Sequence, residues 1–182
     1  MTFGFTVRAW LYIIVLLVSG CATIPPGTCE HFEHTRKSMR YDTVYRYSET
    51  DTRNAKRAFA SAARAEPVTV RWYTVRLNRA QIGQCDHLYL TKELYLQRTT
   101  GTGSTLEEQR EIYIINDRLI ATKREDVTPQ LSAGGFYSAV SALPIPAETP
   151  GGAYKIVSRL VARNGKQERT LATATVEFRV QR

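Results

Sequence analysis

From Val68 almost to the C-terminus, apolar and polar residues alternate along the chain, and this period of two restricts the fold more than any other feature of the sequence. Successive side chains of a β-strand point to opposite faces of a sheet, so each alternating segment predicts a strand with one buried and one solvated face. The segments are Val68–Leu77, Leu88–Leu96, Arg110–Ile115, Arg118–Thr122, Phe136–Leu143, Ala153–Ala162 and Thr170–Val180. The sequence therefore predicts a mainly β protein.

Turn residues separate these segments. Asn164 and Gly165 lie between the last two strands, and Asn-Gly is a strong hairpin signal because both residue types tolerate positive φ. Asn116 and Asp117 share this tolerance and predict a second tight hairpin. Seven or eight short strands joined by such turns predict two sheets that pack face to face.

The N-terminal half carries one strand signal and one helix signal. Met39–Tyr47 is rich in β-forming residues and predicts a first strand. A helix is expected near residues 52–65, with Thr50 or Asp51 as its cap and Pro67 beyond its end. We therefore expect a two-sheet sandwich with one N-terminal α-helix.

The stretch Pro150-Gly-Gly-Ala-Tyr154 precedes a strand rich in Ile and Val. It is similar to the corner that enters the penultimate strand of many bacterial immunoglobulin-like domains. This resemblance covers only the C-terminal part of the chain and implies an immunoglobulin-like sandwich. A transthyretin-like sandwich or a small barrel also accommodates the strand pattern. We expect residues 29–182 to form this structure as a single domain.

The first residues have the layout of an exported protein. Arg8 precedes the uncharged run Ala9–Val18, which is too short to span about 30 Å of hydrocarbon but has the length of a signal-peptide core. The run ends in Val18-Ser19-Gly20-Cys21, which resembles the lipobox of bacterial lipoproteins. The resemblance implies that residues 1–20 are a signal peptide and that Cys21 is lipidated, with palmitate among its acyl chains. The alternative is an ordinary signal peptide in which Cys21 is incidental.

Residues 21–28 then form a lipidated tether. Lipoproteins retained in the inner membrane commonly carry aspartate after the acylated cysteine, whereas this chain has Ala22. The resemblance therefore implies an outer-membrane location with the domain facing the periplasm. The prolines and glycine of the tether favour an extended chain, which keeps the domain within about 25–30 Å of the membrane.

Cys29 and Cys85 are the two cysteines left after export into an oxidising compartment. We expect them to form a disulfide, worth about 4 kcal/mol from the entropy of closing so long a loop. Two buried free thiols are the alternative.

No arrangement of residues points to catalysis. The segment Cys29-Glu-His31-Phe-Glu-His34 lacks the histidine spacing of zinc hydrolases, and a disulfide removes its best ligand, so His31 and His34 are weak metal candidates. His87 is explained by its position at a strand start, and the carboxylate-rich run Glu107–Glu111 is interpreted as solvated. We expect no enzymatic activity, no catalytic residue and no cofactor, and the sequence identifies no ligand-binding residue.

The formal net charge is +8, and arginine supplies 19 of the 25 basic residues. In a cytoplasmic protein this excess would suggest nucleic acid, but export excludes that partner. Anionic lipids, cell-wall polymers and acidic proteins remain, and basic residues scattered over a solvated surface explain the charge equally well.

The first hypothesis is an outer-membrane lipoprotein that acts as a structural or protein-interaction subunit of an envelope assembly, such as a secretion, pilus or transport machine. The second is binding of peptidoglycan or lipopolysaccharide through a basic, tyrosine-rich sheet face. An enzyme with a pocket near His31 or His87 is the third.

Overall fold

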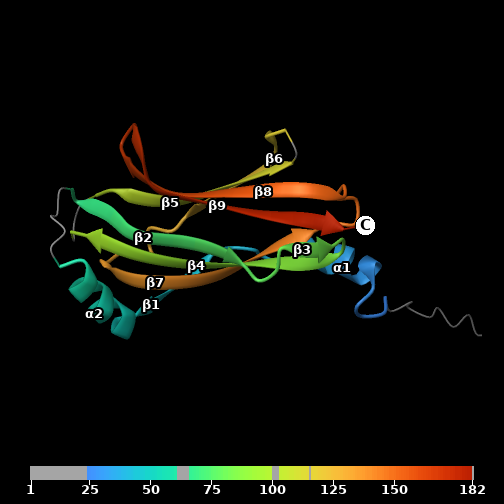
Figure 1. The fold of residues 1–182 in the computed structure, drawn as a ribbon, viewed down its shortest axis with the longest axis horizontal. Helices are drawn as coiled ribbons and strands as arrows, with labels where there is room; N and C mark the ends of the chain where they lie inside the picture. The colour runs from blue at the N-terminus through green and yellow to red at the C-terminus, as the bar shows by residue number, and fades with distance from the viewer. Residues whose placement is uncertain (1–23, 61–65, 100–102, 115, 182) are drawn as a thin grey trace, which may run out of the picture.

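The computed structural model describes residues 24–60, 66–99, 103–114 and 116–181. Within them the chain forms two helices and nine strands, arranged as two packed sheets (Figure 1). The elements are α1 (Cys29–Arg36), β1 (Val44–Ser48), α2 (Glu49–Ala58), β2 (Val68–Leu77), β3 (Gln81–Gly83), β4 (Asp86–Arg98), β5 (Thr105–Ile114), β6 (Arg118–Asp126), β7 (Gly135–Ile145), β8 (Gly152–Asn164) and β9 (Gln167–Gln181). The predicted mainly β, two-sheet sandwich is confirmed.

The strand order is that of an immunoglobulin-like fold. Sheet A has the order β1-β7-β4-β2, and sheet B has the order β3-β9-β8-β5-β6. In the immunoglobulin fold one sheet contains strands A, B, E and D and the other contains C, F and G, with C′ added in the variable type. In sheet A the A, B and E positions are held by β2, β4 and β7. In sheet B the C, F, G and C′ positions are held by β5, β8, β9 and β6. β1 occupies the D place although it precedes the A strand in the chain.

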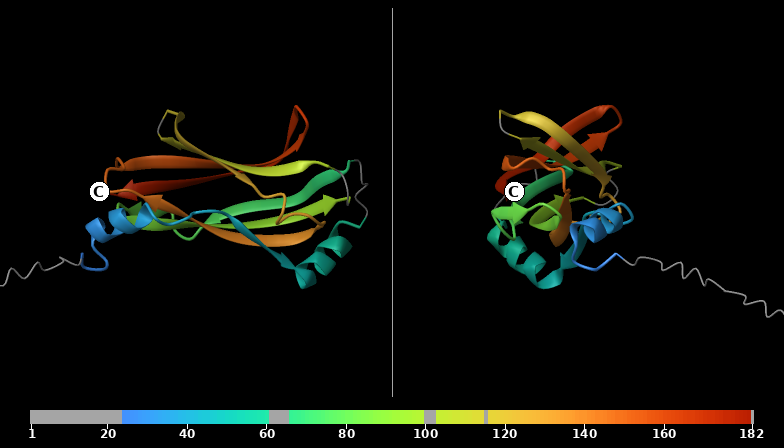
Figure 2. Two further views of the ribbon diagram at one scale, coloured as in Figure 1. Left: turned by 180° about the vertical axis from the view of Figure 1, so that it is seen from behind. Right: turned by 90° about the vertical axis from the view of Figure 1, so that its right-hand side faces the viewer.

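Both predicted hairpins are present. β8 pairs with β9 as far as Asn164 and Gln167, and Gly165 has a φ of +57° in the turn between them. Between β5 and β6, Asn116 and Asp117 have φ values of +65° and +56°. The outer parts of both hairpins project from the body of the sandwich (Figure 2).

The interior contains two groups of apolar side chains. The first lies toward α2 and consists of Tyr45, Val68, Leu94, Leu96, Leu106, Val127, Leu131, Tyr137, Ala139, Leu160 and Ala162. The second lies toward the C-terminus and consists of Val75, Ile82, Leu88, Leu90, Ile145, Tyr154, Ile156, Phe178 and Val180. Buried polar side chains lie between the two groups.

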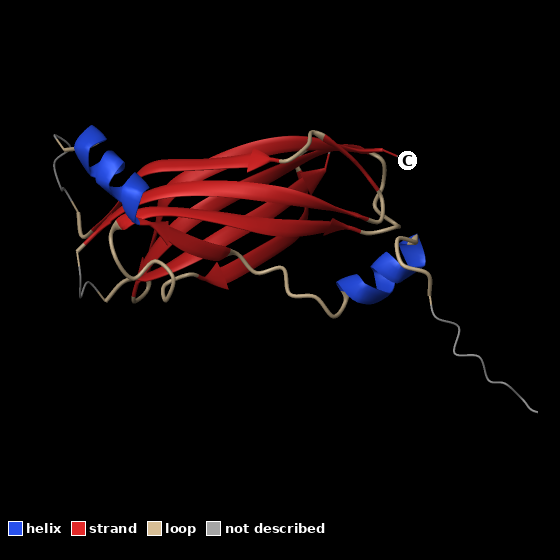
Figure 3. Cartoon of the chain, turned by 90° about the horizontal axis from the view of Figure 1, so that it is seen from below, coloured by secondary structure: helices blue, strands red, loops and turns tan. Residues whose placement is uncertain are grey.

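The helices lie at opposite ends of the sandwich (Figure 3). α2 packs on the outer face of sheet A, where Phe59 stacks on Tyr95 with ring centroids 5.4 Å apart. Ser48 caps α2 by accepting a hydrogen bond from the Asp51 N–H (3.3 Å). The helix therefore begins before the predicted cap at Thr50 or Asp51. It ends at Ala58, and residues 61–65 of the predicted helix lie outside the described residues.

Three features differ from the sequence predictions. The fold has a second helix, α1, whose short polar sequence has no apolar stripe, and Thr28 caps it by accepting a hydrogen bond from the His31 N–H (3.2 Å). The short strand β3 was not predicted, and it pairs in parallel with β9. The first strand begins at Val44 and not at Met39, because Tyr41 leaves the sheet to contact His87. Neither helix of the described part is long and apolar enough to cross a bilayer.

Candidate functional site

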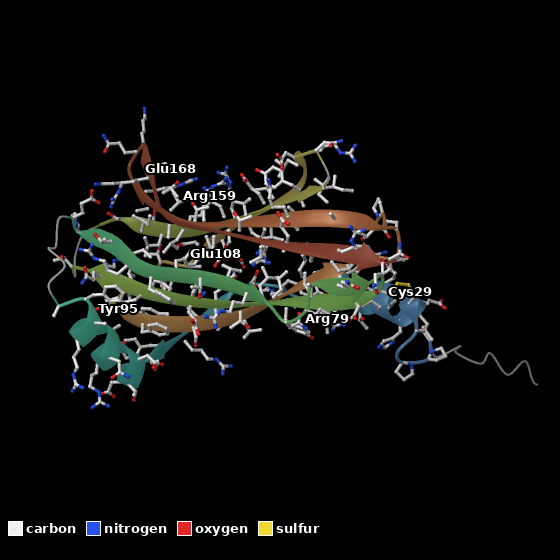
Figure 4. All side chains as sticks on the ribbon, viewed as in Figure 1. Cys29, Arg79, Tyr95, Glu108, Arg159 and Glu168 are labelled. Carbon is white, nitrogen blue, oxygen red and sulfur yellow. A yellow bond between two sulfur atoms is a disulfide. The ribbon has the colours of Figure 1, made fainter. Side chains whose placement is uncertain are left out.

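A disulfide between Cys29 and Cys85 fixes α1 to the sandwich. Their Cα atoms are 5.2 Å apart, and Cys29 begins α1 beside the C-terminal end of the molecule (Figure 4). The Cys85 N–H also donates to the carbonyl of Ile145 (2.8 Å). The expected cysteine pair is therefore present, whereas Cys21, the expected lipidation site, lies outside the described residues.

His87 lies near the start of β4 in sheet A, and its ring packs against α1. Its Nε2 lies 3.1 Å from the Tyr41 hydroxyl, and its ring centroid lies 4.9 Å from that of Phe32 on α1. Glu33 of α1 accepts a hydrogen bond from the Ala147 N–H (2.9 Å). His87 is therefore a packing residue that helps to hold α1 in place.

The two weak metal candidates do not meet a wider ligand set. His31 and His34 both lie on α1, and His34 is exposed. Across the described residues, no three His, Cys, Asp or Glu side chains are arranged to hold a metal ion.

Polar side chains cross the interior between the two apolar groups, and we call this set the polar belt. Its members are Thr43, Tyr45, Tyr73, Lys92, Glu108, Arg110, Glu125 and Ser158. At its centre Lys92 of sheet A forms an ion pair with Glu108 of sheet B, and the two residues are 0% and 1% exposed. Glu108 lies between the two sheets (Figure 4). Glu108 also accepts a hydrogen bond from the Tyr45 hydroxyl (2.9 Å).

A second cation of the belt lies nearer the edge of the sandwich. Arg110 is 3% exposed, and its Nη2 donates to Thr43 Oγ1 (3.1 Å) and Glu125 Oε2 (3.4 Å). Glu125 in turn accepts a hydrogen bond from the Thr43 N–H (2.9 Å). The belt thus matches two buried cations with two carboxylates, as buried charges require.

Burial sets the protonation of the belt. It lowers the pKa of Lys92 to about 8, while the negative charge of Glu108 acts in the opposite direction. Burial also raises the pKa of the Tyr45 and Tyr73 phenols, and the charge of Glu108 adds to this effect. Both phenols therefore stay protonated. Tyr45 donates its hydroxyl proton to Glu108, and the Tyr73 hydroxyl lies 2.8 Å from Ser158 Oγ.

Sequence reasoning missed the belt, although its signal was present. Lys92 stands at an inward position of the alternating strand, between Leu90 and Leu94. Glu108 and Arg110 likewise occupy inward positions of β5. A charged residue in the apolar phase of a strand indicates a buried partner, because an unpaired buried charge is costly.

The carboxylate-rich run Glu107–Glu111 divides between the two faces of sheet B. Glu108 is buried inside, so the interpretation of the run as solvated is wrong for this residue. Glu107 pairs with Arg163 (3.2 Å) and Glu111 with Arg159 (2.5 Å) on the outer face, where Figure 4 labels Arg159. Because the sheet separates these carboxylates from Glu108, they do not flank a common substrate.

Side chains cover the free edge of β1. Gln130 Oε1 accepts a hydrogen bond from the Tyr45 N–H (2.6 Å), and Gln130 Nε2 donates to the carbonyl of Thr43 (3.1 Å). The side-chain amide therefore binds the backbone as a neighbouring strand would, which blocks strand addition.

The edge formed by β6 in sheet B is not covered in this way. β6 is the edge strand of sheet B, and residues 118–122 are exposed on both faces. Leu119 and Ile120 are 48% and 47% exposed there. The pairing with β5 is irregular around Ile120, which bends the tip of the hairpin outward. β6 therefore presents both an unpaired backbone edge and exposed apolar side chains.

The outer face of sheet A between the two helices is also partly apolar. Val44 and Val140 are cross-strand partners and are 57% and 59% exposed. Trp72 and Tyr89 are exposed on the neighbouring strands, and Arg76 is exposed near them.

No family model matches the chain, and no curated protein matches its sequence. Several solved structures share part of the fold. The C-terminal domain of wzt is 10% identical, covers 82% of this chain and 84% of its own, and has a TM-score of 0.49. An immunoglobulin-like protein from Pseudomonas aeruginosa is 10% identical, with coverages of 65% and 100% and a TM-score of 0.39. A CARDB domain from Pyrococcus furiosus is 14% identical, with coverages of 62% and 91% and a TM-score of 0.36. The fold assignment made above rests on the strand order.

Proposed function

We propose that this chain is an outer-membrane lipoprotein whose sandwich is a protein-interaction subunit of an envelope assembly, and that a partner protein docks along β6. The exposure of β6 on both faces carries the proposal, because monomeric proteins normally pair, shorten or cover such an edge. Leu119 and Ile120 add apolar area of the kind that marks interaction sites.

The arrangement of the chain supports anchoring at the α1 end. The disulfide and the contacts of His87 hold α1 firmly, so a lipid on Cys21 would be separated from the fold only by the short tether of residues 21–28. Two or three acyl chains on one residue give stable membrane attachment.

Docking along β6 is tested by capture from detergent-solubilised membranes. We expect the full-length chain with Leu119→Lys and Ile120→Lys to lose its partners, because two charges replace the apolar contact. The control is Val44→Lys with Val140→Lys, which adds the same two charges at similarly exposed strand positions of sheet A. If the control loses its partners and the β6 variant keeps them, the interface lies on sheet A and not along β6.

Anchoring is tested separately with Cys21→Ser. We expect the wild-type chain to incorporate labelled palmitate and to sediment with outer-membrane vesicles. The variant should incorporate no palmitate. Equal labelling of both chains would exclude acylation at Cys21.

A second function, binding of peptidoglycan or lipopolysaccharide, is favoured by the outer face of sheet A. Trp72 and Tyr89 offer exposed rings for stacking on sugars, and Arg76 offers charge for phosphate groups. If this surface binds cell-wall polymer, Trp72→Ala with Tyr89→Ala should reduce co-sedimentation with purified peptidoglycan severalfold, whereas the β6 variant should not. Binding that is unchanged by both variants would exclude both surfaces.

A further inference from the structure

A groove of about 450 Å³ opens beside the polar belt, at the edge between the two sheets. It exists because β1 is short: it covers β7 only from Phe136 to Val140. Beyond that point the inner side of sheet B faces outward between β6, the later part of β7 and the segment Met39–Asp42. The sandwich is therefore open where the polar belt reaches the surface.

The walls of the groove are largely apolar. Ile112 of β5, Ala121 of β6 and the pair Leu143 and Pro144 of β7 line it, and Met39 closes one side. Its volume lies within the range of about 300–1,000 Å³ that is usual for small-molecule sites. The walls suit a hydrocarbon chain.

A buried cation with free hydrogen-bonding capacity lies at the base. Arg110 lines the groove, is only 3% exposed, and has an Nε with no partner among the described residues. Its Nη2 is already held by Thr43 and Glu125. A buried donor without a partner is unusual. This Nε has almost no accessible surface of its own, so an acceptor in the groove would reach it only after the Arg110 side chain turns toward the groove.

The charges of the groove and belt leave an excess of one positive charge. The cations are Arg40, Lys92, Arg110 and Lys123, and the carboxylates are Asp42, Glu108 and Glu125. Lys123 lies at the rim, where it pairs with Asp42 and Glu125 at 3.0 Å each. One additional carboxylate would balance the site.

We propose that this groove binds a free fatty acid, with its carboxylate toward Arg110 and Lys123 and its hydrocarbon tail along Ile112, Ala121 and Leu143. The head is recognised by charge and by the guanidinium, which suits planar carboxylates. The tail is recognised by the apolar walls. Nothing in the proposed docking along β6 requires this ligand, so the two proposals stand independently.

The test uses the full-length chain in lipid nanodiscs and a photoactivatable decanoate with a diazirine on its tail. After irradiation, mass spectrometry should locate the label on β5, β6, β7 or residues 39–42, which line the groove. Unlabelled decanoate should compete, whereas decanol and decyltrimethylammonium should compete at least tenfold less well. From hexanoate to decanoate, competition should strengthen about fourfold per methylene.

Matched variants separate specific binding from partition into the nanodisc. Ala121→Trp fills the groove and should reduce labelling at least tenfold. Ala153→Trp, the same change at an exposed strand position outside the groove, should have no effect. Lys123→Met should weaken competition by decanoate while leaving that by decanol unchanged, and it alters no buried side chain of the core.

Three results would overturn the proposal. They are a label that falls outside the groove, equal competition by decanoate and decanol, and labelling that persists in Ala121→Trp while this variant unfolds at the same temperature as the wild type. If Ala121→Trp is itself unstable, the proposal is rejected when decanoate competes as strongly in Lys123→Met as in the wild type.

Discussion

Lys92 stands in the middle of a face of leucines, and within the described part of the chain the carboxylate in direct contact with it is that of Glu108 of the opposite sheet. Such a pair adds little net stability over an apolar pair, because desolvation offsets the attraction of the charges. What it adds is a fixed alignment of the two sheets, since sliding one past the other would leave a buried charge unpaired. The polar belt therefore fixes how the two sheets are aligned with each other.

Breaking this pair from one side should be strongly destabilising. We expect Lys92→Met to lower the free energy of unfolding by about 3–5 kcal/mol, because Glu108 would be left charged in the interior. The double variant with Glu108→Gln should recover much of this loss, and urea denaturation measures both. A double variant that loses the sum of the two single changes would show that the residues act independently.

The outer pair between Arg159 and Glu111 is the matched control. Both side chains are partly exposed, so Arg159→Met should cost less than about 1 kcal/mol.

Because two tyrosine phenols are buried, we expect the free energy of unfolding to fall at alkaline pH. In the unfolded chain a tyrosine loses its proton near pH 10, whereas burial raises the pKa of Tyr73 and Tyr45 in the folded protein. Above pH 10 the folded state therefore binds more protons than the unfolded state, so the free energy of unfolding falls as pH rises. Below pH 10 this contribution is fully present.

Tyr73→Phe tests this effect. Urea denaturation between pH 8 and 11 should show a shallower alkaline decline than in the wild type. At neutral pH the variant should lose about 1 kcal/mol, because Ser158 loses its partner. The exposed Tyr89→Phe is the control, and an identical decline in all three chains would contradict the assignment.

At the scale of elements, the four sheet edges differ in how they are protected. β3 is only three residues long, and Gln130 covers β1. β2 and β6 each contain a bulge, near Val70 and Ile120, but most residues of β2 are at least partly buried. β6 has nine residues with an open backbone. This contrast, more than any single side chain, supports the proposed docking along β6.

Gln130→Ala should uncover the edge of β1. We expect a loss of about 1–2 kcal/mol, because the Tyr45 N–H and the Thr43 carbonyl lose their partner. We also expect faster self-association, visible by light scattering, because unpaired edges recruit strands. Gln181→Ala, which removes a surface contact to Gln81, is the control. Equal scattering from both variants would argue against a protective role for Gln130.

The sequence predicted some elements well and others poorly for identifiable reasons. Strong alternation located β2 exactly at Val68–Leu77, and the Asn-Gly pair located the last hairpin. Alternation does not reveal α1, because a short helix held by a disulfide needs no apolar stripe. It also does not reveal the groove, which depends on how far β1 extends along β7. Before Val44 the chain makes tertiary contacts, such as that of Tyr41 with His87, which local preference does not reveal.

At the scale of the whole molecule, α1 and the C-terminus lie at one end of the sandwich and α2 lies at the other (Figure 1). β4 has 13 residues, which at about 3.3 Å each spans roughly 40 Å between these ends. An anchor on Cys21 would therefore hold the α1 end near the bilayer and the α2 end far from it.

This orientation is measurable by fluorescence. A dye on Lys37→Cys, next to α1, should be quenched more strongly by spin-labelled lipid headgroups than a dye on Lys56→Cys, on α2. The difference follows from the separation of the two ends. Equal quenching at both positions would indicate a sandwich that lies flat on the membrane.

The place of β1 in sheet A has a further consequence for the order of folding if the protein is secreted as proposed. Val44 of β1 pairs with Val140 of β7, so the strand must wait for most of the polypeptide to emerge before it finds its neighbour. The Cys29–Cys85 link closes a separation of only 56 residues and becomes available earlier. If the chain is exported as proposed, oxidation would hold the N-terminal segment beside β4 before β7, the neighbour of β1, has emerged.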